Sequence, residues 1–475
     1  MKRTSRMKID GHFGRSVPSI WLLIFSLVLT ALPLSACKKV TNSFPTFPST
    51  ESVSSSETSE TTEYSAPKTY ELTIASPLSY ETCQYLAKLY VAKSQGLLGE
   101  GVDGETVDLD FLSSIDLPFV LNVYGTSDTG CNLSTLAKWR ADGKLPDIFL
   151  AGEFDLSVGA GYILPITDYL AETPLPSADR IYPQMLREFS REDLQFGIPY
   201  QNSVAVLYCD MEVLNQAGIS AVSYQQSKKS LENLLVKINE LNQEERVALP
   251  FYMAGEMMLF LPCSLQNSRY LSVSVTEDRL ESAYRSSMDY VSHLVESGYT
   301  YESLTEEEAD LLFDGLSPLL SRKVGIWTGM TDEILRYDNY MPNTLSLMQF
   351  PTTEDDVYSP PLLASYPLCV SSTCENPKEA VELLTFMALD EDALLLTARL
   401  QSREGYLPSV SYPSVWKAVT GRQKYGMYLI QYEDKMDQAI YIPAISQSAR
   451  FQQDQGYILE TIEPNLMIKE ENQDE

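Results

Sequence analysis

The strongest constraint on the fold is a strand, a helix and a second strand that follow one another between residues 119 and 151. Residues 119–124 (FVLNVY) alternate apolar and polar side chains, and 146–151 (PDIFLA) are a short apolar run. Between them, residues 133–140 place apolar side chains on one helical face, and Gly143 is suited to end that helix in the left-handed conformation. Such a unit is right-handed and has parallel strands, so the sequence predicts an α/β fold.

The length of the chain indicates more than one core. A chain of 475 residues exceeds what a single core usually organises, so we expect two lobes of about 200 residues each. A second strand-to-helix junction follows further along the chain. Residues 204–209 (VAVLYC) are a buried type of strand, and Asp210 can cap a helix over 211–217 that Gly218 ends.

The first residues are typical of an export signal. A positively charged start precedes an uncharged apolar stretch at 20–32 (IWLLIFSLVLTAL), which is too short to span a membrane. Leu34-Ser35-Ala36-Cys37 follows at once and resembles the lipobox of bacterial lipoproteins. We therefore expect a signal peptide over 1–36, with Cys37 lipidated as the new first residue. An ordinary signal peptide or an uncleaved anchor is the alternative.

The segment after Cys37 is too polar to fold. Residues 41–67 contain 14 Ser or Thr and three Pro, so they cannot bury enough apolar surface to offset the entropy of ordering. We expect a disordered stalk over 37–67 and an acidic, solvated tail over 469–475. The globular part would lie outside the cytoplasm, held to the cell membrane by the lipid alone.

The charge and the histidine content exclude several functions. The net charge is −30, which disfavours a nucleic-acid partner because phosphates would be repelled. There are two histidines, His12 and His293, too few for a multi-histidine metal site, and most serine or cysteine triads are nearly excluded. The cysteines fit no zinc spacing. Cys369 and Cys374 are the best disulfide pair by proximity, and buried free thiols are about as plausible.

Several short motifs, in order along the chain, resemble one family. The chain resembles the extracellular solute-binding proteins of bacterial ABC importers, in the carbohydrate-type family that includes maltose-binding proteins. The segments that carry the resemblance are 145–149 (LPDIF), 161–169 (GYILPITDY), 196–200 (FGIPY), 207–210 (LYCD), 216–219 (QAGI), 323–329 (KVGIWTG) and 376–380 (NPKEA).

The resemblance implies two α/β lobes joined by a hinge, with a cleft between them. The expected first lobe comprises 68–202 and 352–405, and the second 203–350 and 408–468. It also implies a monomer without cofactor, metal or enzymatic activity that captures a sugar or oligosaccharide by hinge closure and delivers it to the permease subunits of the importer.

Candidate binding residues follow from this fold and from sugar chemistry. Aromatic faces stack on the C–H surfaces of sugars, while carboxylates and amides bind hydroxyls. Trp327 is the first stacking candidate, and Tyr200 and Tyr406 are the next. The expected hydroxyl partners are Glu153, Gln201 and Asn202, with Glu153 at the carboxyl end of a strand, where α/β sheets bind ligands.

Alternatives remain for these residues and for the function. Trp327 is otherwise a core residue, and Glu153 a solvated loop carboxylate. A lipid-anchored glycosidase could use two carboxylates, such as Glu153 and Asp210. A surface carbohydrate sensor without transport is a further alternative.

Overall fold

The computed structural model describes residues 70–172, 179–243, 245–253, 289–290, 292–351 and 360–441. The expected signal peptide, Cys37, the stalk, Cys263, the acidic tail and the segment 442–468 lie outside these residues. Within the described ranges, no helix has both the length and the apolar character needed to cross a bilayer.

In the described part of the chain, nine strands form one mixed sheet. They are β1 (Tyr70–Ser76), β2 (Phe119–Gly125), β3 (Ile148–Leu150), β6 (Gly197–Asp210), β7 (Leu249–Tyr252), β8 (Val324–Met330), β9 (Leu345–Gln349), β10 (Leu362–Val370) and β11 (Ile440–Tyr441). The order is β2-β1-β3-β10-β6-β8-β7, with β11 beside β10 and β9 beside β6. A short hairpin of β4 (Ser190–Arg191) and β5 (Leu194–Gln195) stands apart.

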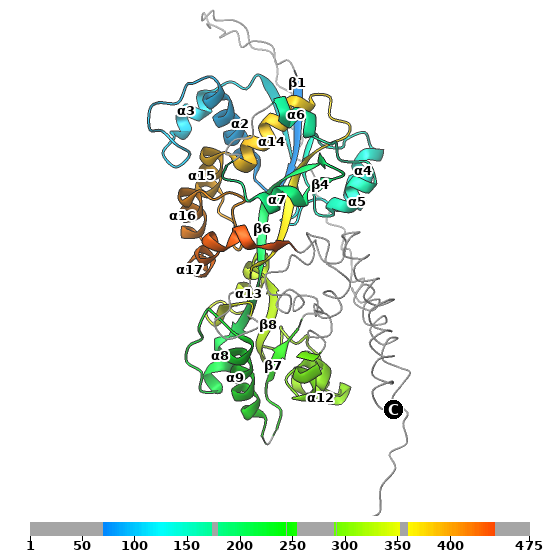
Figure 1. Cartoon of the computed structure of the whole chain (residues 1–475), viewed down its shortest axis with the longest axis vertical. Coiled ribbons are helices and arrows are strands. Elements are labelled where there is room, and N and C mark those ends of the chain that lie inside the picture. The colour runs from blue at the N-terminus through cyan, green and yellow to red at the C-terminus, as the bar shows by residue number, and fades with distance from the viewer. Residues whose placement is uncertain are drawn as a thin grey trace, which may run out of the picture. The chain divides into compact units, whose positions relative to one another are not determined.

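The long strand β6 joins the two lobes. Its first half pairs antiparallel with β10, from Gly197 to Val204. Its second half, from Ala205 to Asp210, pairs with β8 and β9 instead. We therefore call the β1-β2-β3-β10 side the first lobe and the β7-β8-β9 side the second lobe, with β6 running through both (Figure 1).

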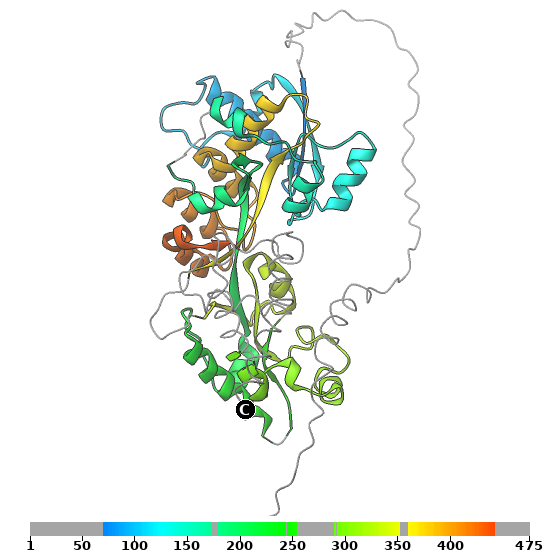
Figure 2. The same ribbon diagram turned by 45° about the vertical axis from the view of Figure 1, so that its right-hand side comes forward.

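Helices cover both faces of the first lobe's sheet, with α2, α14 and α15 on one side and α4 and α5 on the other (Figures 1 and 2). The helices are α2 (Tyr80–Ser94), α3 (Leu109–Ser114), α4 (Leu133–Ala141), α5 (Phe154–Gly159), α6 (Thr167–Glu172), α7 (Pro183–Glu188), α8 (Met211–Gln216), α9 (Lys228–Asn239), α12 (Glu306–Phe313), α13 (Ile334–Tyr340), α14 (Pro377–Leu389), α15 (Glu391–Leu400), α16 (Pro413–Gly421) and α17 (Gly426–Leu429). The described residues also include the 3₁₀ segments η1 (Glu240–Asn242), η3 (Tyr301–Ser303), η4 (Thr331–Glu333) and η5 (Ile430–Gln438).

Alternation along buried strands divides the core between these layers. In β3, Ile148 and Leu150 pack into the core beneath α2, α14 and α15, whereas Phe149 packs with Leu136 and Phe154 of α4 and α5. A strand covered on both faces must be apolar throughout. This explains why the sequence IFL reads as a continuous apolar run.

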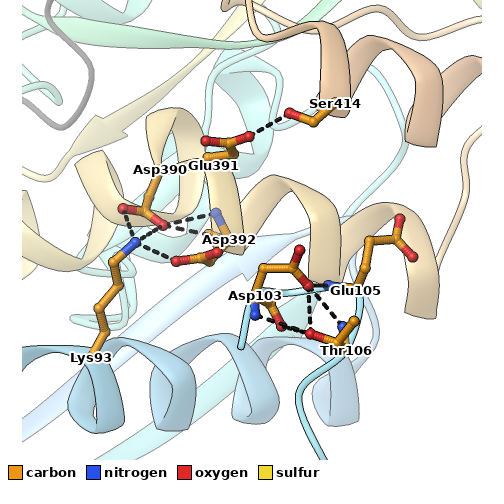
Figure 3. A network of polar contacts seen from close by, with 9 residues as sticks. Lys93, Asp103, Glu105, Thr106, Asp390, Glu391, Asp392 and Ser414 are labelled. Carbon is orange, nitrogen blue, oxygen red and sulfur yellow. Dashed lines mark hydrogen bonds and ion pairs between the residues drawn. The ribbon is translucent and has the colours of Figure 1, made fainter. Parts of the chain in front are cut away.

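A lysine ties two helices of the first lobe together. Lys93 in the last turn of α2 places its ammonium 2.9 Å from both carboxylate oxygens of Asp390, and it also pairs with Asp392 (Figure 3). Asp390 caps α15 by accepting from the backbone N–H of Asp392. The cation is favourable at the end of α2, and the carboxylates are favourable at the start of α15, because both match the helix dipoles.

The local predictions from the sequence are largely confirmed. The βαβ pattern appears as β2, α4 and β3, with β1 lying between the two strands and parallel to both. Gly143 and Gly218 end their helices at positive φ, and Asp210 accepts from Glu212 N as the N-cap of α8. The sequence Asn376-Pro377-Lys378-Glu379 is also typical of a helix start, and α14 does begin at Pro377, but the Asn376 side chain makes no capping hydrogen bond.

Part of the expected second lobe packs elsewhere. Residues 408–468 were assigned to that lobe, but Val415 and Ala418 of α16 lie in the core that contains α2, α14 and α15. The loop before α16 is hydrogen-bonded to the first half of β6, which lies in the first lobe. The apolar face of α16 therefore packs against α15.

The suggested disulfide is not formed. Cys369 and Cys374 are both free thiols, as are Cys83, Cys131 and Cys209. Cys369 is fully buried in β10, whereas Cys374 is partly exposed beyond the strand and bonds through its thiol to the Asp147 carboxyl. The disulfide predicted from proximity in sequence is therefore wrong, because the two side chains lie in different surroundings.

Candidate functional site

Four of the six predicted binding residues lie at or beside the middle of β6. Tyr200, Gln201 and Asn202 are consecutive in the strand, just before it changes partners. Tyr406 precedes Leu407, which forms an isolated bridge with Asn202. We call Gln201, Tyr366, Asp332, Arg403 and Tyr406 the β6 site, for the reasons given below.

Gln201 carries a buried amide without a partner. The residue is 3% exposed, and neither its Oε1 nor its Nε2 has a hydrogen-bond partner among the described residues. Leaving such a group unpaired costs about 1–3 kcal/mol, and native proteins seldom tolerate it without a reason. The amide is therefore available to a bound molecule that offers both a donor and an acceptor.

Asn202 positions the loop that carries Tyr406. Its Nδ2 donates to Leu407 O at 2.9 Å and to Ser409 Oγ at 2.8 Å. Leu407 N donates in return to Asn202 O at 2.8 Å. Asn202 is fully buried, so in this structure it holds the loop in place, although it was expected to bind ligand directly.

Tyr406 and Arg403 lie on the loop that bridges β6 at Asn202, and Tyr406 is close to Asp332. The Arg403 guanidinium lies 4.4 Å from the centroid of the Tyr406 ring, a cation–π contact. Its Nη2 pairs with Asp128 Oδ1 at 2.5 Å. Burial raises the pKa of the Tyr406 and Tyr200 hydroxyls, so both remain neutral donors and acceptors near pH 7.

Asp332 is the residue that the sequence analysis missed. It lies in η4, directly after β8, and is only partly buried. The Tyr366 hydroxyl donates to its Oδ2 at 3.5 Å. Burial, helped by the neighbouring Glu333 charge, raises the pKa of the Asp332 carboxyl to about 7, while the hydroxyls of Tyr366 and Ser203 oppose the rise.

The sheet register brings Tyr366 to Gln201. The two residues are paired partners across β10 and β6, and in an antiparallel pair directly opposite side chains share a face. The Tyr366 hydroxyl reaches Asp332, so the orphan amide, the phenol and the carboxyl are contributed by three elements from both lobes.

Trp327 is fully buried in β8, with none of its surface exposed. Its ring stacks on Tyr208 at 5.7 Å and meets Tyr337 edge to face at 5.4 Å. This position in the core is what the alternative for Trp327 described. Among the described residues, Trp327 makes no hydrogen bond or ring contact with a residue of the β6 site.

The side chain of Glu153 is engaged at the start of α4. Its Oε2 accepts from Leu133 N at 2.8 Å, at the first turn of α4. A carboxylate is favourable there because it meets the positive end of the helix dipole. The carboxylate named with it as a possible catalytic pair, Asp210, is fully buried and bonded to Arg322 at 3.1 Å.

The β6 site offers binding chemistry. It combines one amide, neutral phenols, one carboxyl and one guanidinium, groups that donate to and accept from hydroxyls. Among the described residues, no cluster of three His, Cys, Asp or Glu side chains is arranged to hold a metal ion.

Solved structures with a similar fold are sugar-binding proteins. An ABC substrate-binding protein from Listeria monocytogenes, in complex with cycloalternan, is 12% identical over 83% of this chain and 97% of its own, with a TM-score of 0.55. A cyclic α-maltosyl-1,6-maltose binding protein from Arthrobacter globiformis is 12% identical over 82% and 95%, with a TM-score of 0.54. A sugar transporter from Rhizobium etli in an open conformation is 14% identical over 83% and 96%, with a TM-score of 0.52.

These likenesses establish the fold. The chain has the two-lobed α/β architecture of those solute-binding proteins, which confirms the predicted fold class. The sequence matches no family model and no curated protein.

Proposed function

We propose that the protein is the solute-binding subunit of an ABC importer and captures a neutral sugar or oligosaccharide at the β6 site. The observation that carries the proposal is the buried, unpaired amide of Gln201 beside Tyr366 and Asp332, at the strand shared by both lobes. A protein with the same fold has been solved in complex with cycloalternan, and another is named a cyclic α-maltosyl-1,6-maltose binding protein. Sugar hydroxyls both donate and accept, so they can satisfy the two atoms of the amide.

Capture would proceed by hinge closure. β6 connects the lobes, and the loop containing Gly405 passes beside η4 so closely that a Cβ on Gly405 would meet Thr331 O at 1.8 Å. Gly405 has φ +84, which also favours glycine. The strand β6 and the loop with Gly405 hold Tyr406 next to Asp332. A ligand that touches Tyr406 and Asp332 together would bind one arrangement of the lobes more tightly than another. Such a difference in affinity is what ligand-driven closure requires.

Binding of a sugar can be tested by thermal shift. The panel we propose is cycloalternan, cyclic α-maltosyl-1,6-maltose, mannobiose and maltotriose. A ligand that binds only the folded state at a hundred times its Kd stabilises it by about 2.7 kcal/mol. At least one panel sugar should therefore raise the melting temperature measurably, and chromatography should return that sugar intact. Cleavage that is lost in a single carboxylate variant would favour a glycosidase instead.

We also propose that Cys37 carries a lipid that holds the protein on the outer face of the cell membrane. The support is the apolar stretch before Leu34-Ser35-Ala36-Cys37 and the polar stalk after it. In a Cys37→Ala variant whose signal peptide has been removed, the protein should leave the membrane fraction, because the stalk offers too little apolar surface to anchor it. Fractionation and immunoblotting measure this. Retention of the processed variant on membranes would contradict the proposal.

A further inference from the structure

The side chain of Asp332 is a carboxyl without a cation. Among the described residues it forms no ion pair. Arg403 is nevertheless near, because Asp332 and Arg403 both act on the pKa of the Tyr406 hydroxyl, which the carboxylate raises and the guanidinium lowers. Arg403 instead pairs with Asp128. A carboxylate that is partly removed from water and has no cation is unfavourable unless hydrogen-bond donors satisfy it.

The side-chain donors around Asp332 are neutral hydroxyls. Tyr366 OH lies at 3.5 Å, the long limit for a hydrogen bond, and the Ser203 hydroxyl also lowers the pKa of the carboxyl. The titratable and charged groups around Asp332 come from several elements: Tyr208 from β6, Tyr366 from β10, Tyr406 and Arg403 from the loop after α15, Asp128 beyond Arg403, and Glu333 beside it in η4. From α13, Arg336 pairs with Glu333 at 3.5 Å and the Tyr337 hydroxyl donates to Glu333 Oε1 at 3.1 Å. The side-chain donors to the carboxylate are therefore neutral hydroxyls rather than cations, and the unpaired amide of Gln201 belongs to the same site.

We propose that Asp332 makes sugar capture depend on pH, because its carboxylate accepts a stronger, charge-assisted hydrogen bond from a hydroxyl of the bound sugar than its neutral, protonated form does. This inference rests on the proposed function of the β6 site. The ligand hydroxyl would add a donor to those of Tyr366 and Ser203, so binding and ionisation of Asp332 favour each other.

The sign and size of the effect follow from the linkage. With a pKa of about 7 in the free protein, about one tenth of the Asp332 carboxyls are ionised at pH 6 and most are ionised at pH 8. If the ionised form alone is competent, the Kd should be about tenfold weaker at pH 6 than at pH 8.

The experiment is calorimetric titration of the full chain with the four panel sugars at pH 6 and pH 8, on the wild type and three variants. Asp332→Asn should bind with the same Kd at both pH values. Glu333→Gln should keep the dependence but move its midpoint to lower pH, because a charge that raises the Asp332 pKa is lost. Asp310→Asn, an exposed carboxylate on α12, is the matched control and should behave as the wild type.

A measurement without ligand accompanies this titration. The pKa of Asp332 is higher in the folded protein than in the unfolded chain, so its contribution favours folding at low pH and is lost as pH rises from about 4 to about 7. The melting temperature of the wild type should therefore fall relative to Asp332→Asn between pH 5 and pH 8.

The outcomes separate the two proposals. A panel sugar that binds the wild type equally at pH 6 and pH 8 overturns the role of Asp332 and leaves the binding function standing. A melting-temperature difference between wild type and Asp332→Asn that is independent of pH also overturns that role. If no panel sugar binds at either pH, the proposed function fails and this inference fails with it.

Discussion

Replacing Trp327 by alanine is expected to lower the free energy of unfolding by about 3–5 kcal/mol, the usual cost of truncating a large buried aromatic residue. Trp327 is fully buried between strand and helix, with ring contacts to Tyr208 and Tyr337. Its removal therefore leaves a cavity in the packed second lobe. Denaturant unfolding measures the loss, and calorimetry of the folded fraction measures sugar affinity in the same variant.

Two matched variants sharpen this test. Trp327→Phe keeps most of the ring packing and removes an indole N–H that has no partner among the described residues, so it should cost much less. Trp139→Ala removes a tryptophan that is only partly buried on α4, and a smaller loss is expected there. If Trp327→Ala instead left stability unchanged and weakened affinity about thirtyfold, Trp327 would be the stacking residue and the β6 site would be misplaced.

The fold could be predicted from local patterns because those patterns are strong. The apolar run 204–209 between polar residues and the capping Asp210 indicated a strand followed by a helix, and both are present as β6 and α8. The strand is longer than expected and begins at Gly197, because pairing with β10 extends it through 197–203 (GIPYQNS), which contains glycine, proline and polar residues. Pairing of this kind is a tertiary effect that propensity does not report.

The site was less accessible to sequence reasoning. Asp332 stands in the sequence Thr331-Asp332-Glu333, which is typical of a helix start, and its role depends on Tyr366 from another strand. A signal did exist, since Asp332 directly follows the buried strand β8 and polar residues at the carboxyl ends of strands often bind ligands. The contact of Asn202 with Leu407 joins residues 205 positions apart, and no local pattern predicts it.

Replacing Gln201 by methionine is expected to raise the stability of the ligand-free protein and to weaken sugar binding. Methionine has a similar length and flexibility but no polar amide to leave unpaired, so unfolding should require about 1–2 kcal/mol more. The same change removes a donor and an acceptor from the β6 site, so Kd for a bound panel sugar should rise about tenfold or more. Denaturant unfolding and calorimetric titration give the two quantities.

The matched control is Gln184→Met. Gln184 is buried to a similar degree, with 6% exposed against 3% for Gln201, but its Nε2 donates to Met436 O. Removing that amide leaves the carbonyl of Met436 without its partner, so Gln184→Met should lower stability by about 1–3 kcal/mol and leave sugar affinity unchanged. Opposite signs for the same substitution at the two glutamines would show that the amide of Gln201 serves binding at a cost in stability. A loss of stability in both variants would mean that the Gln201 amide is satisfied within the protein, and the sugar site would then have to be sought elsewhere.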